Sequence, residues 1–301
     1  MKYEQARSFI YRNARPLDIA RWKYLFENGS KEDVLTALIA YQNEDGGFGN
    51  ALEPDYWNPN SSPMQTWVAT EIIKEINLKD KNHPIIQGIL NYLSLGKDFD
   101  GHTWSNTVAT NNDYPHAPWW NFKPSEETSY NPTACFIGFI LKFADKSSRL
   151  FELVCVLAKE AYSYFKKHFP MESMHTVSCF VELYEYIKES SMNNLLDIEE
   201  FSNLLHQQIQ YVLTYDTSKW AVDYVCKPSL FIGTKTSDFY MENKEICYYE
   251  CKFILNTQES DGTWGITWAW TDYPEQWNIS KNWWKSDLII KNIRYIKAIH
   301  S

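Results

Sequence analysis

The stretch YQNEDGGF, residues 41–48, carries the clearest structural signal in this 301-residue chain. It follows an apolar, helix-like run and has the spacing Gln-x-x-Asp-Gly-x-aromatic. The same spacing returns in TQESDGTW, residues 257–264, after another apolar run, and a shorter version, DGHTW, occupies residues 100–104. Recurrence of one unit after successive helices predicts a fold assembled from repeated helical hairpins.

Apolar residues elsewhere recur at the spacing of one helix face, and no stretch alternates as a strand does. Prolines and serines stand where first turns would begin. The sequence predicts ten or eleven helices, over residues 3–12, 16–27, 30–43, 63–77, 84–95, 131–145, 148–168, 173–189, 196–213, 241–256 and 283–300. Between them lie long loops rich in Asp, Gly, Trp, Tyr, Pro and Asn, over residues 43–62, 96–130, 214–240 and 257–282. We therefore expect an all-α fold whose long loops carry its function.

The repeated loops resemble the Gln-Trp repeat of squalene–hopene cyclases and their relatives. The best copies are Gln42, Gly46 and Phe48, and Gln258, Gly262 and Trp264. This resemblance implies the α/α toroid shared by terpenoid cyclases and protein prenyltransferase β subunits, a barrel of helical hairpins with long loops at one end. We expect a single toroid domain over residues 1–301.

The catalytic motifs of that superfamily are not present in the sequence. The Asp-x-Asp-Asp motif of class II cyclases has its nearest counterpart in DFDG, residues 98–101, which lacks the final Asp, and no Asp-Asp-x-x-Asp cluster occurs for magnesium and diphosphate. The prenyltransferase zinc site is imitated by Glu245, Cys247 and His300, but Glu replaces Asp and no Lys/Arg cluster is nearby to receive a diphosphate. We expect neither a metal nor a cofactor.

Two acidic and aromatic loops carry the candidate site. Residues 50–57, NALEPDYW, place two carboxylates two positions apart, and residues 111–121, NNDYPHAPWWN, add an acid, an imidazole and two indoles. Paired carboxylates serve as acid and base when their pKa values differ; the alternative is that they cap helices and order the loops. The expected catalytic residues are Asp113, the first choice as proton donor, Asp55, the second choice, and their hydrogen-bonding partners Glu53 and His116.

The 13 Trp, 20 Tyr and 16 Phe residues suit an aromatic cavity. Aromatic rings stabilise developing carbocations by their negative faces and also stack on sugars, so composition does not separate these uses. The expected substrate-binding residues are Tyr114, Trp119, Trp120, Trp264 and Trp268, for which ordinary packing is the alternative.

These features favour a terpenoid-cyclase-like enzyme that performs acid–base chemistry on an apolar or polycyclic small molecule in a central aromatic cavity. One alternative is a carbohydrate-active barrel, a glycoside hydrolase or lyase, that uses two loop carboxylates such as Asp55 and Asp113, or Asp113 and Asp272. A second is a non-catalytic toroid that binds a ligand or a partner, in which the repeated loops only lock helices together.

Charge and composition exclude several other classes. The chain has 38 acidic and 29 basic residues, a net charge of −9, which argues against nucleic-acid binding because that depends on clustered Lys and Arg. No signal peptide is recognisable, and no apolar run approaches the ~20 residues that span a bilayer. Six cysteines without Cys-x-x-Cys spacing fit reduced thiols. We expect a cytoplasmic protein with a small-molecule substrate or ligand, and the sequence does not indicate an oligomeric state.

Overall fold

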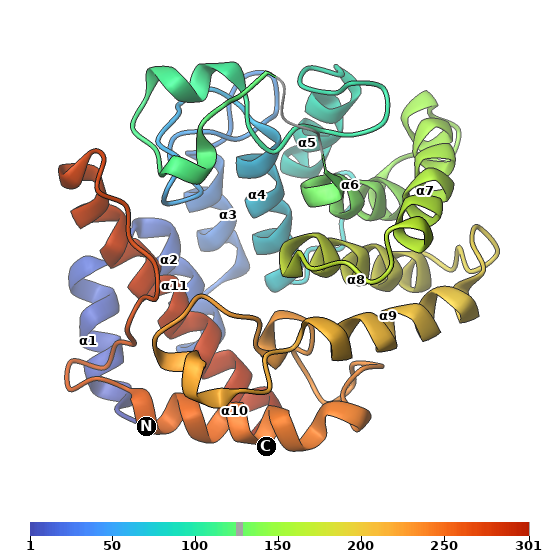
Figure 1. Ribbon diagram of the computed structural model, residues 1–301. Coiled ribbons are helices and arrows are strands. Elements are labelled where there is room, and N and C mark those ends of the chain that lie inside the picture. Colours follow the sequence, from blue (N-terminus) through green and yellow to red (C-terminus); the bar gives the residue numbers. More distant parts are fainter. Residues whose placement is uncertain (125–128, 301) are drawn as a thin grey trace. The chain divides into compact units, whose positions relative to one another are not determined.

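The computed structural model describes residues 1–124 and 129–300 and consists of helices joined by loops (Figure 1). Its contacts divide the chain into two compact units: unit 1 comprises Met1–Ala40 and Leu213–Ser301, and unit 2 comprises Tyr41–Val212. No strand occurs in the described residues, where only isolated bridges are found. The all-α prediction is confirmed, and the single toroid over residues 1–301 stays a prediction. Part of the expected loop 96–130, residues 125–128, lies outside the described residues.

Unit 1 contains five α-helices and three short 3-10 helices within its described residues. They are α1 (Tyr3–Asn13), α2 (Pro16–Phe26), α3 (Lys31–Ile39), η3 (Thr217–Ala221), η4 (Pro228–Leu230), η5 (Met241–Asn243), α10 (Lys244–Thr257) and α11 (Pro274–His300). Helix α11 packs against α1, α2 and α10, and α2 also packs against α3.

A buried ionic network joins α2 to α11 inside unit 1. Asp18 accepts hydrogen bonds from Arg15 Nε at 2.8 Å and from Arg21 Nη1 at 3.0 Å. The same Arg21 Nη1 lies 3.0 Å from Asp287 Oδ1, and Lys291 Nζ lies 2.8 Å from Asp287 Oδ2. Because an unpaired buried charge is costly, these pairs fix how α2 and α11 meet.

Unit 2 contains six α-helices and two 3-10 helices within its described residues. They are α4 (Pro63–Glu75), α5 (Pro84–Ser94), η1 (Ala109–Asp113), η2 (Pro118–Trp120), α6 (Tyr130–Phe143), α7 (Arg149–Lys167), α8 (Met174–Glu189) and α9 (Ile198–Val212). Helix α6 packs against α4, α7 and α8 and is buried along nearly its whole length, as expected for a helix that is apolar on all sides.

Local signals explain where these helices begin. Ser62, Ser148 and Ser173 each accept a hydrogen bond from a backbone N–H in the first turn that follows. Pro63 and Pro84 occupy first helical positions, where no N–H partner is needed. The predicted helix positions are confirmed with shifts of a few residues at most places.

Two predicted helix boundaries are wrong. The helix expected over residues 30–43 ends at Ile39, because the chain then enters a turn at Ala40 and Tyr41. The helix expected over residues 283–300 begins nine residues earlier, at Pro274. A proline needs no N–H partner in a first turn, and the N–H of Trp277 bonds the carbonyl of Tyr273 at 3.0 Å, so the first turn is formed there.

Helices α6 and α8 run in the same direction. The Cys135 thiol is hydrogen-bonded to the Glu182 carboxyl near the middle of both helices. Further along both helices, Lys142 Nζ lies 2.7 Å from Glu189 Oε2. A Cβ atom on Gly138 would lie 2.5 Å from Cδ2 of Tyr186, so the glycine lets the two helices approach closely.

The loop after α3 uses its glutamine to attach itself to α5. Gln42 Nε2 donates to the carbonyls of Gly46 at 2.9 Å and Ile85 at 3.3 Å. Gly46 has φ of +88°, which favours glycine. The Phe48 side chain is fully buried, and its backbone N–H donates to Thr66 Oγ1 at 3.0 Å.

The loop after α10 has the same local structure in unit 1. Gln258 Nε2 donates to the Gly262 carbonyl at 3.0 Å, and Oε1 accepts from the Lys2 backbone N–H at 2.7 Å, at the start of α1. Gly262 also has φ of +88°. The ring of Trp264 is buried, with Nε1 donating to the Ile254 carbonyl at 2.8 Å. The two stretches with equal spacing thus form equal turns, each attached to the first turn of another helix.

The shorter third copy keeps the aspartate turn and the buried aromatic residue. Asp100 Oδ1 accepts from the Thr103 backbone N–H at 2.7 Å, and Gly101 has φ of +103°. The Trp104 backbone N–H donates to Thr133 Oγ1 on α6 at 2.8 Å, as Phe48 does to a threonine of α4. The two copies in unit 2 are therefore each joined to a threonine of the next long helix, α4 or α6.

Candidate functional site

The two loops that the sequence singles out lie together beyond the N-terminal end of α4 (Figure 1). Three hydrogen bonds join them: Trp57 N to Pro115 O at 3.0 Å, Ala117 N to Asp55 O at 2.9 Å, and Asn58 Nδ2 to Asn111 Oδ1 at 3.0 Å. Residues 50–57 and 111–121 are thus brought together as one layer of unit 2.

The predicted acids of this layer differ in burial. Asp55 is 1% exposed and Glu53 is 6% exposed, and Glu53 Oε2 accepts from the Asp55 backbone N–H at 2.7 Å, so one of its oxygens orders the turn. Asp113, at the end of η1, is exposed to solvent. Asp113 as the first-choice proton donor stays a prediction, at an exposed position, whereas Asp55, the second choice, is buried.

His116 is buried and fixed by its neighbours. Its Nδ1 lies 2.6 Å from the Tyr114 carbonyl and its Nε2 lies 2.6 Å from Asn121 Oδ1. A carbonyl accepts only, so Nδ1 carries a proton and the ring is oriented by the loop backbone. These contacts support an ordering role for His116 within its own loop.

The predicted aromatic residues fall in both units. In unit 2, Trp119 is 46% exposed, Tyr114 is half-buried, and Trp120 stacks on Tyr56 with ring centroids 5.5 Å apart. Trp264 and Trp268 belong to unit 1, where Trp268 meets Trp284 edge to face at 5.2 Å. Within unit 2, only Trp120 among the predicted tryptophans joins an aromatic cluster.

A second group of side chains, on α4 and α8, was not predicted from the sequence. Glu71 of α4 and Glu182 of α8 are hydrogen-bonded to each other through their carboxyl groups. Glu182 is 7% exposed, and Oε1 of each carboxyl is buried and has no hydrogen-bond partner among the described residues. Two carboxyl groups in such close contact disfavour the ionised form of Glu182.

Charge and burial determine the protonation of this carboxyl pair. Burial raises the pKa of Glu182 well above its usual range, and the Glu71 carboxyl raises it further. Lys74 acts in the opposite direction, as does the Cys135 thiol that is hydrogen-bonded to Glu182. Burial and the neighbouring carboxyl group therefore both favour the protonated form of Glu182.

Lys74 lies one helical turn beyond Glu71 on α4. Its Nζ is 2.9 Å from Glu185 Oε2 and 5.4 Å from the ring centroid of Tyr186. Burial lowers the pKa of Lys74, but the carboxylates around it, Glu182 first, raise it well above its ordinary value. Lys74 thus stays charged beside the carboxyl pair and limits the rise in the pKa of Glu182.

An aromatic cluster continues the same face of α4 toward its N-terminus. Tyr56, Met64 and Val108 form a buried cluster, against which Trp67 and Trp120 pack while keeping part of their surfaces open. Trp67 precedes Glu71 by four residues, so it lies one helical turn away on the same face. The indole Nε1 atoms of Trp67 and Trp120 are buried and have no acceptor within the described part of the chain. The carboxyl group of Glu71 and the aromatic ring of Trp67 therefore lie next to each other on one face of α4.

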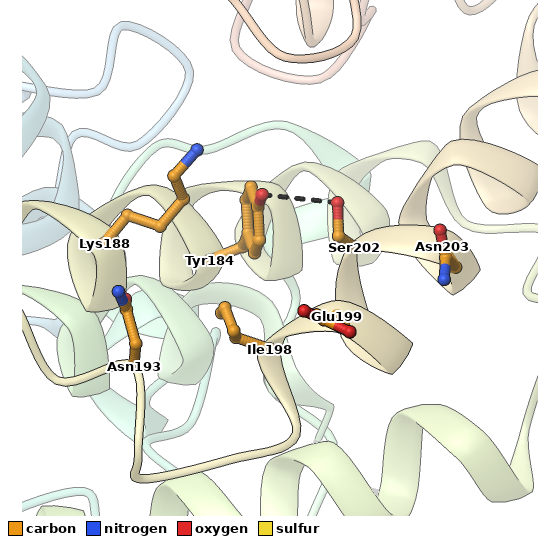
Figure 2. Close-up of a pocket in the computed structure, with 7 residues that line it drawn as sticks. All are labelled: Tyr184, Lys188, Asn193, Ile198, Glu199, Ser202 and Asn203. Carbon is orange, nitrogen blue, oxygen red and sulfur yellow. Dashed lines mark hydrogen bonds between the residues drawn. The ribbon is translucent and has the colours of Figure 1, made fainter.

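Two surface recesses, one in each unit, do not include the carboxyl pair or the aromatic cluster. One of about 380 Å³ lies between α8 and α9 (Figure 2). It is lined by Tyr184, Lys188, Asn193, Ile198, Glu199, Ser202 and Asn203. Tyr184 Oη donates to Ser202 Oγ at 3.2 Å, which links α8 to α9 among the lining residues (Figure 2). Another, of about 290 Å³, is lined by Leu255, Ile296, Lys297 and His300 in unit 1. Neither contains a predicted site residue, and the predicted aromatic cavity stays a prediction.

Across residues 1–124 and 129–300, no group of three or more His, Cys, Asp or Glu side chains is placed to hold a metal ion. This includes Glu245, Cys247 and His300. No described helix is both long and apolar enough to cross a bilayer.

Comparison with known proteins does not assign the chain to a family. No family model, curated protein or solved structure matches it. The resemblance to terpenoid cyclases and prenyltransferases therefore stays a prediction carried by the repeated loops.

Two features of the sequence point to the residues of α4 and α8 that were not predicted as site residues. Glu182 is a charged residue inside the apolar helical run 179–184, where an acid needs a partner or a proton. Trp67, Glu71 and Lys74 recur at helical spacing and give α4 a polar and aromatic stripe. Neither signal reveals that the two helices meet.

Proposed function

We propose that this chain is an α/α-toroid protein of the terpenoid-cyclase and prenyltransferase class, and that it performs acid–base chemistry on a largely apolar small molecule. The proposed site is the face of α4 that carries Trp67 and Glu71, together with Glu182 of α8. The observation that carries the proposal is the buried Glu71–Glu182 carboxyl pair beside partly open aromatic side chains.

The directions of the helices support a toroid. In a ring of helical hairpins, alternate helices run the same way. Glu71 meets Glu182, and one turn further along each helix Lys74 meets Glu185, so α4 and α8 are parallel. Helices α6 and α8 are parallel as well, so α4, α6 and α8 share one direction. The equal turns at Gln42 and Gln258 support repetition of the same hairpin in both units.

The raised pKa of Glu182 favours a particular kind of proton transfer. A carboxyl group with a raised pKa keeps its proton at neutral pH but is a weak acid, so it suits protonation of an oxygen rather than of an alkene carbon. Glu182 donates its proton to that oxygen, and Glu71 accepts a proton from an adjacent carbon or from water. This assignment fits elimination, isomerisation or hydrolysis of an oxygen-containing apolar molecule.

The carbohydrate alternative receives less support from the same geometry. Glycoside hydrolases hold their two carboxyl groups about 5–9 Å apart, with the scissile bond between them. Glu71 and Glu182 are in hydrogen-bond contact, and of the loop acids Asp55 is buried while Asp113 is exposed. No described pair within unit 2 is shown spanning an open cleft.

A turnover screen tests this function. The purified protein is incubated with a pool of isoprenoid alcohols and their esters, and with a pool of oligosaccharides, and products are followed by mass spectrometry. We expect turnover in the apolar pool and a loss of at least about 100-fold in Glu182→Gln and Glu71→Gln. Glu189→Gln, on the same helix but paired with Lys142 at the surface, is the matched control and retains activity.

Other outcomes reject the proposal. Loss of turnover in Asp55→Asn with full activity in Glu182→Gln moves the site to the loop layer. Turnover of oligosaccharides alone favours the carbohydrate-active alternative. No turnover in either pool, with a Glu182→Gln variant that behaves as the parent protein does, favours a non-catalytic toroid.

A further inference from the structure

The recess between α8 and α9 is a feature of unit 2 that the proposed function does not use. Its volume is about 380 Å³, within the range of roughly 300–1,000 Å³ that small-molecule sites span. The side chains that line it come from the last turns of α8, the connection 190–197 and the first turns of α9 (Figure 2). A ligand in this recess therefore contacts two helices of one unit and neither member of the carboxyl pair.

Helical spacing aligns the lining side chains along each helix. On α8, Lys188 follows Tyr184 by four residues, and its Nζ lies 5.2 Å from the centroid of the Tyr184 ring. On α9, the lining residues are 198–199 and 202–203, which are also four positions apart and so lie on one face. The hydrogen bond from Tyr184 to Ser202 joins these two faces.

The connection between the helices is ordered by its own backbone. The N–H of Met192 bonds the carbonyl of Ile187 at 3.0 Å, and the N–H of Leu195 bonds the carbonyl of Met192 at 2.8 Å. Ser191 has φ of +54°, the left-handed conformation in which many helices end. Asn193, between these bonds, is thereby held beside the recess.

The polar groups of the recess keep hydrogen-bonding capacity for a ligand. Asn193, Glu199 and Asn203 are exposed, and none of their side chains forms a hydrogen bond or ion pair with the described part of the chain. Ser202 Oγ accepts the proton of Tyr184 Oη and still has its own hydrogen to donate. Four polar side chains are thus available at one place.

The roles of these groups define the chemistry of the ligand. The Glu199 carboxylate only accepts hydrogen bonds, the Lys188 ammonium only donates them, and the side-chain amides do both. A hydroxyl group also does both, so several neighbouring hydroxyls match this mixture. Because the charges of Glu199 and Lys188 are opposite, a ligand with a net charge would be attracted by one and repelled by the other.

We propose that the recess between α8 and α9 binds a neutral, polyhydroxylated molecule, a single sugar ring. Its hydroxyls donate to Glu199 and accept from Ser202 and from the two amides, while Ile198 contacts its C–H groups. The site is separate from the reaction proposed for Glu71 and Glu182.

Binding of simple glycosides to the full-length protein tests this site. The probes are the methyl glycosides of glucose, galactose and mannose, which share size and charge but differ in the directions of their hydroxyls. Titrations are followed by NMR at the side-chain amide signals, with Asn193 and Asn203 assigned from their alanine variants. We expect at least one glycoside to bind with a Kd of about 1 mM, the affinity that three or four hydrogen bonds supply, and to shift both signals.

Surface variants identify the residues that hold the sugar. Glu199→Gln and Asn203→Ala each weaken binding at least about fivefold, the effect of one lost hydrogen bond. Gln207→Ala is the matched control, because Gln207 is exposed on α9 one turn beyond Asn203 and does not line the recess. Glu182→Gln also leaves the affinity unchanged, which shows that the site is separate from the carboxyl pair.

Three results would overturn the proposal. The first is the absence of saturable binding for all three glycosides. The second is binding that moves neither asparagine signal or that Gln207→Ala weakens as much as Asn203→Ala does. The third is binding of L-alanine, a zwitterion, at the two amides without binding of any glycoside, which rejects the polyhydroxylated class.

Discussion

Lys74 Nζ lies 2.9 Å from Glu185 Oε2, one turn of α4 beyond the place where Glu71 meets Glu182. One ammonium group therefore stands beside three carboxyl groups, contributed by two parallel helices. The raised pKa of Glu182 favours a proton on this carboxyl, which reduces the negative charge that would otherwise be buried there. Proton retention by this pair has consequences for stability that are measurable without a substrate.

Glu182→Gln is expected to change the pH dependence of unfolding. The pKa of Glu182 is raised above its value in the unfolded chain, about 4.3, so the folded state binds more protons above that pH. The stabilisation is complete below the unfolded pKa and is lost as pH rises through the folded pKa. Relative to Glu182→Gln, the parent protein loses up to about 1.4 kcal/mol per pH unit within that window. Urea unfolding measured from pH 4 to pH 9 checks this slope, and parallel curves would contradict it.

The same variant has a spectroscopic signature. A protonated carboxyl group shows a carbonyl stretch in the infrared that a carboxylate lacks. We expect this band in the folded protein at neutral pH and expect Glu182→Gln to remove it, because Glu182 holds the proton of the pair. Glu189→Gln, a surface variant, leaves the band intact. A neutral-pH spectrum without the band would mean that the pair holds no proton.

Gly46→Ala and Gly262→Ala are expected to be strongly destabilising. Each glycine has φ of +88°, and an added Cβ would lie 2.1 Å from the Gly88 carbonyl oxygen or the Ala6 nitrogen respectively. Backbone strain and overpacking together cost about 2–5 kcal/mol. Gly96→Ala, at φ of +64° with no atom within 4 Å of the added Cβ, is the matched control and loses only about 1 kcal/mol. Equal losses in denaturant unfolding would contradict the close approach.

Gln258→Ala is expected to loosen the first turn of α1. The side chain bonds the Lys2 backbone N–H and the Gly262 carbonyl, so its removal frees the start of that helix. We expect faster hydrogen exchange over residues 2–6 and a loss of about 1–3 kcal/mol. Gln42→Ala provides the comparison, because it should speed exchange at the start of α5 and leave α1 unchanged. Unaltered exchange at α1 in Gln258→Ala would be the contrary result.

Asp287→Asn tests the buried network of unit 1. The charges of Lys291 and Arg21 hold the pKa of Asp287 well below its usual range, despite the opposing effect of burial. Its stabilisation is present above the unfolded pKa, about 3.9, and is lost as pH falls toward the folded pKa. We expect Asp287→Asn to cost about 3–5 kcal/mol near neutral pH and to flatten the acid limb of the stability curve. The control is Glu32→Gln, an exposed first-turn acid of α3, and a similar loss there would refute a specific role for the network.

Much of the secondary structure could be predicted because its signals are local. Ser62 and Pro63 mark the start of α4 by themselves, and the apolar residues of α7 recur on one face of a helix. The start of α11 was missed because residues 274–282 mix Trp, Asn, Ile and Ser without a clear apolar period. Similarly, the turn at Gly262 could be inferred from the turn at Gly46, since both repeat the same residues.

The candidate site was predicted only in part. The sequence predicted a site on the two loops that carry Glu53, Asp55 and His116. In the structure these loops form one layer, which includes Trp120. It did not distinguish Asp55, which is buried, from Asp113, which is exposed. The two acids have similar neighbours along the chain, and their difference arises from which loops cover them.

The sequence by itself determined the helices, their caps and the repeated turns, because each depends on residues within a few positions of one another. The tertiary structure alone decided that Glu71 meets Glu182 and that Lys74 reaches Glu185. These partners are 111 residues apart, and they meet only because α4 and α8 both pack against α6 and run in the same direction. Protonation depends on burial and neighbouring charge, and both are properties of the packed helices rather than of either segment alone.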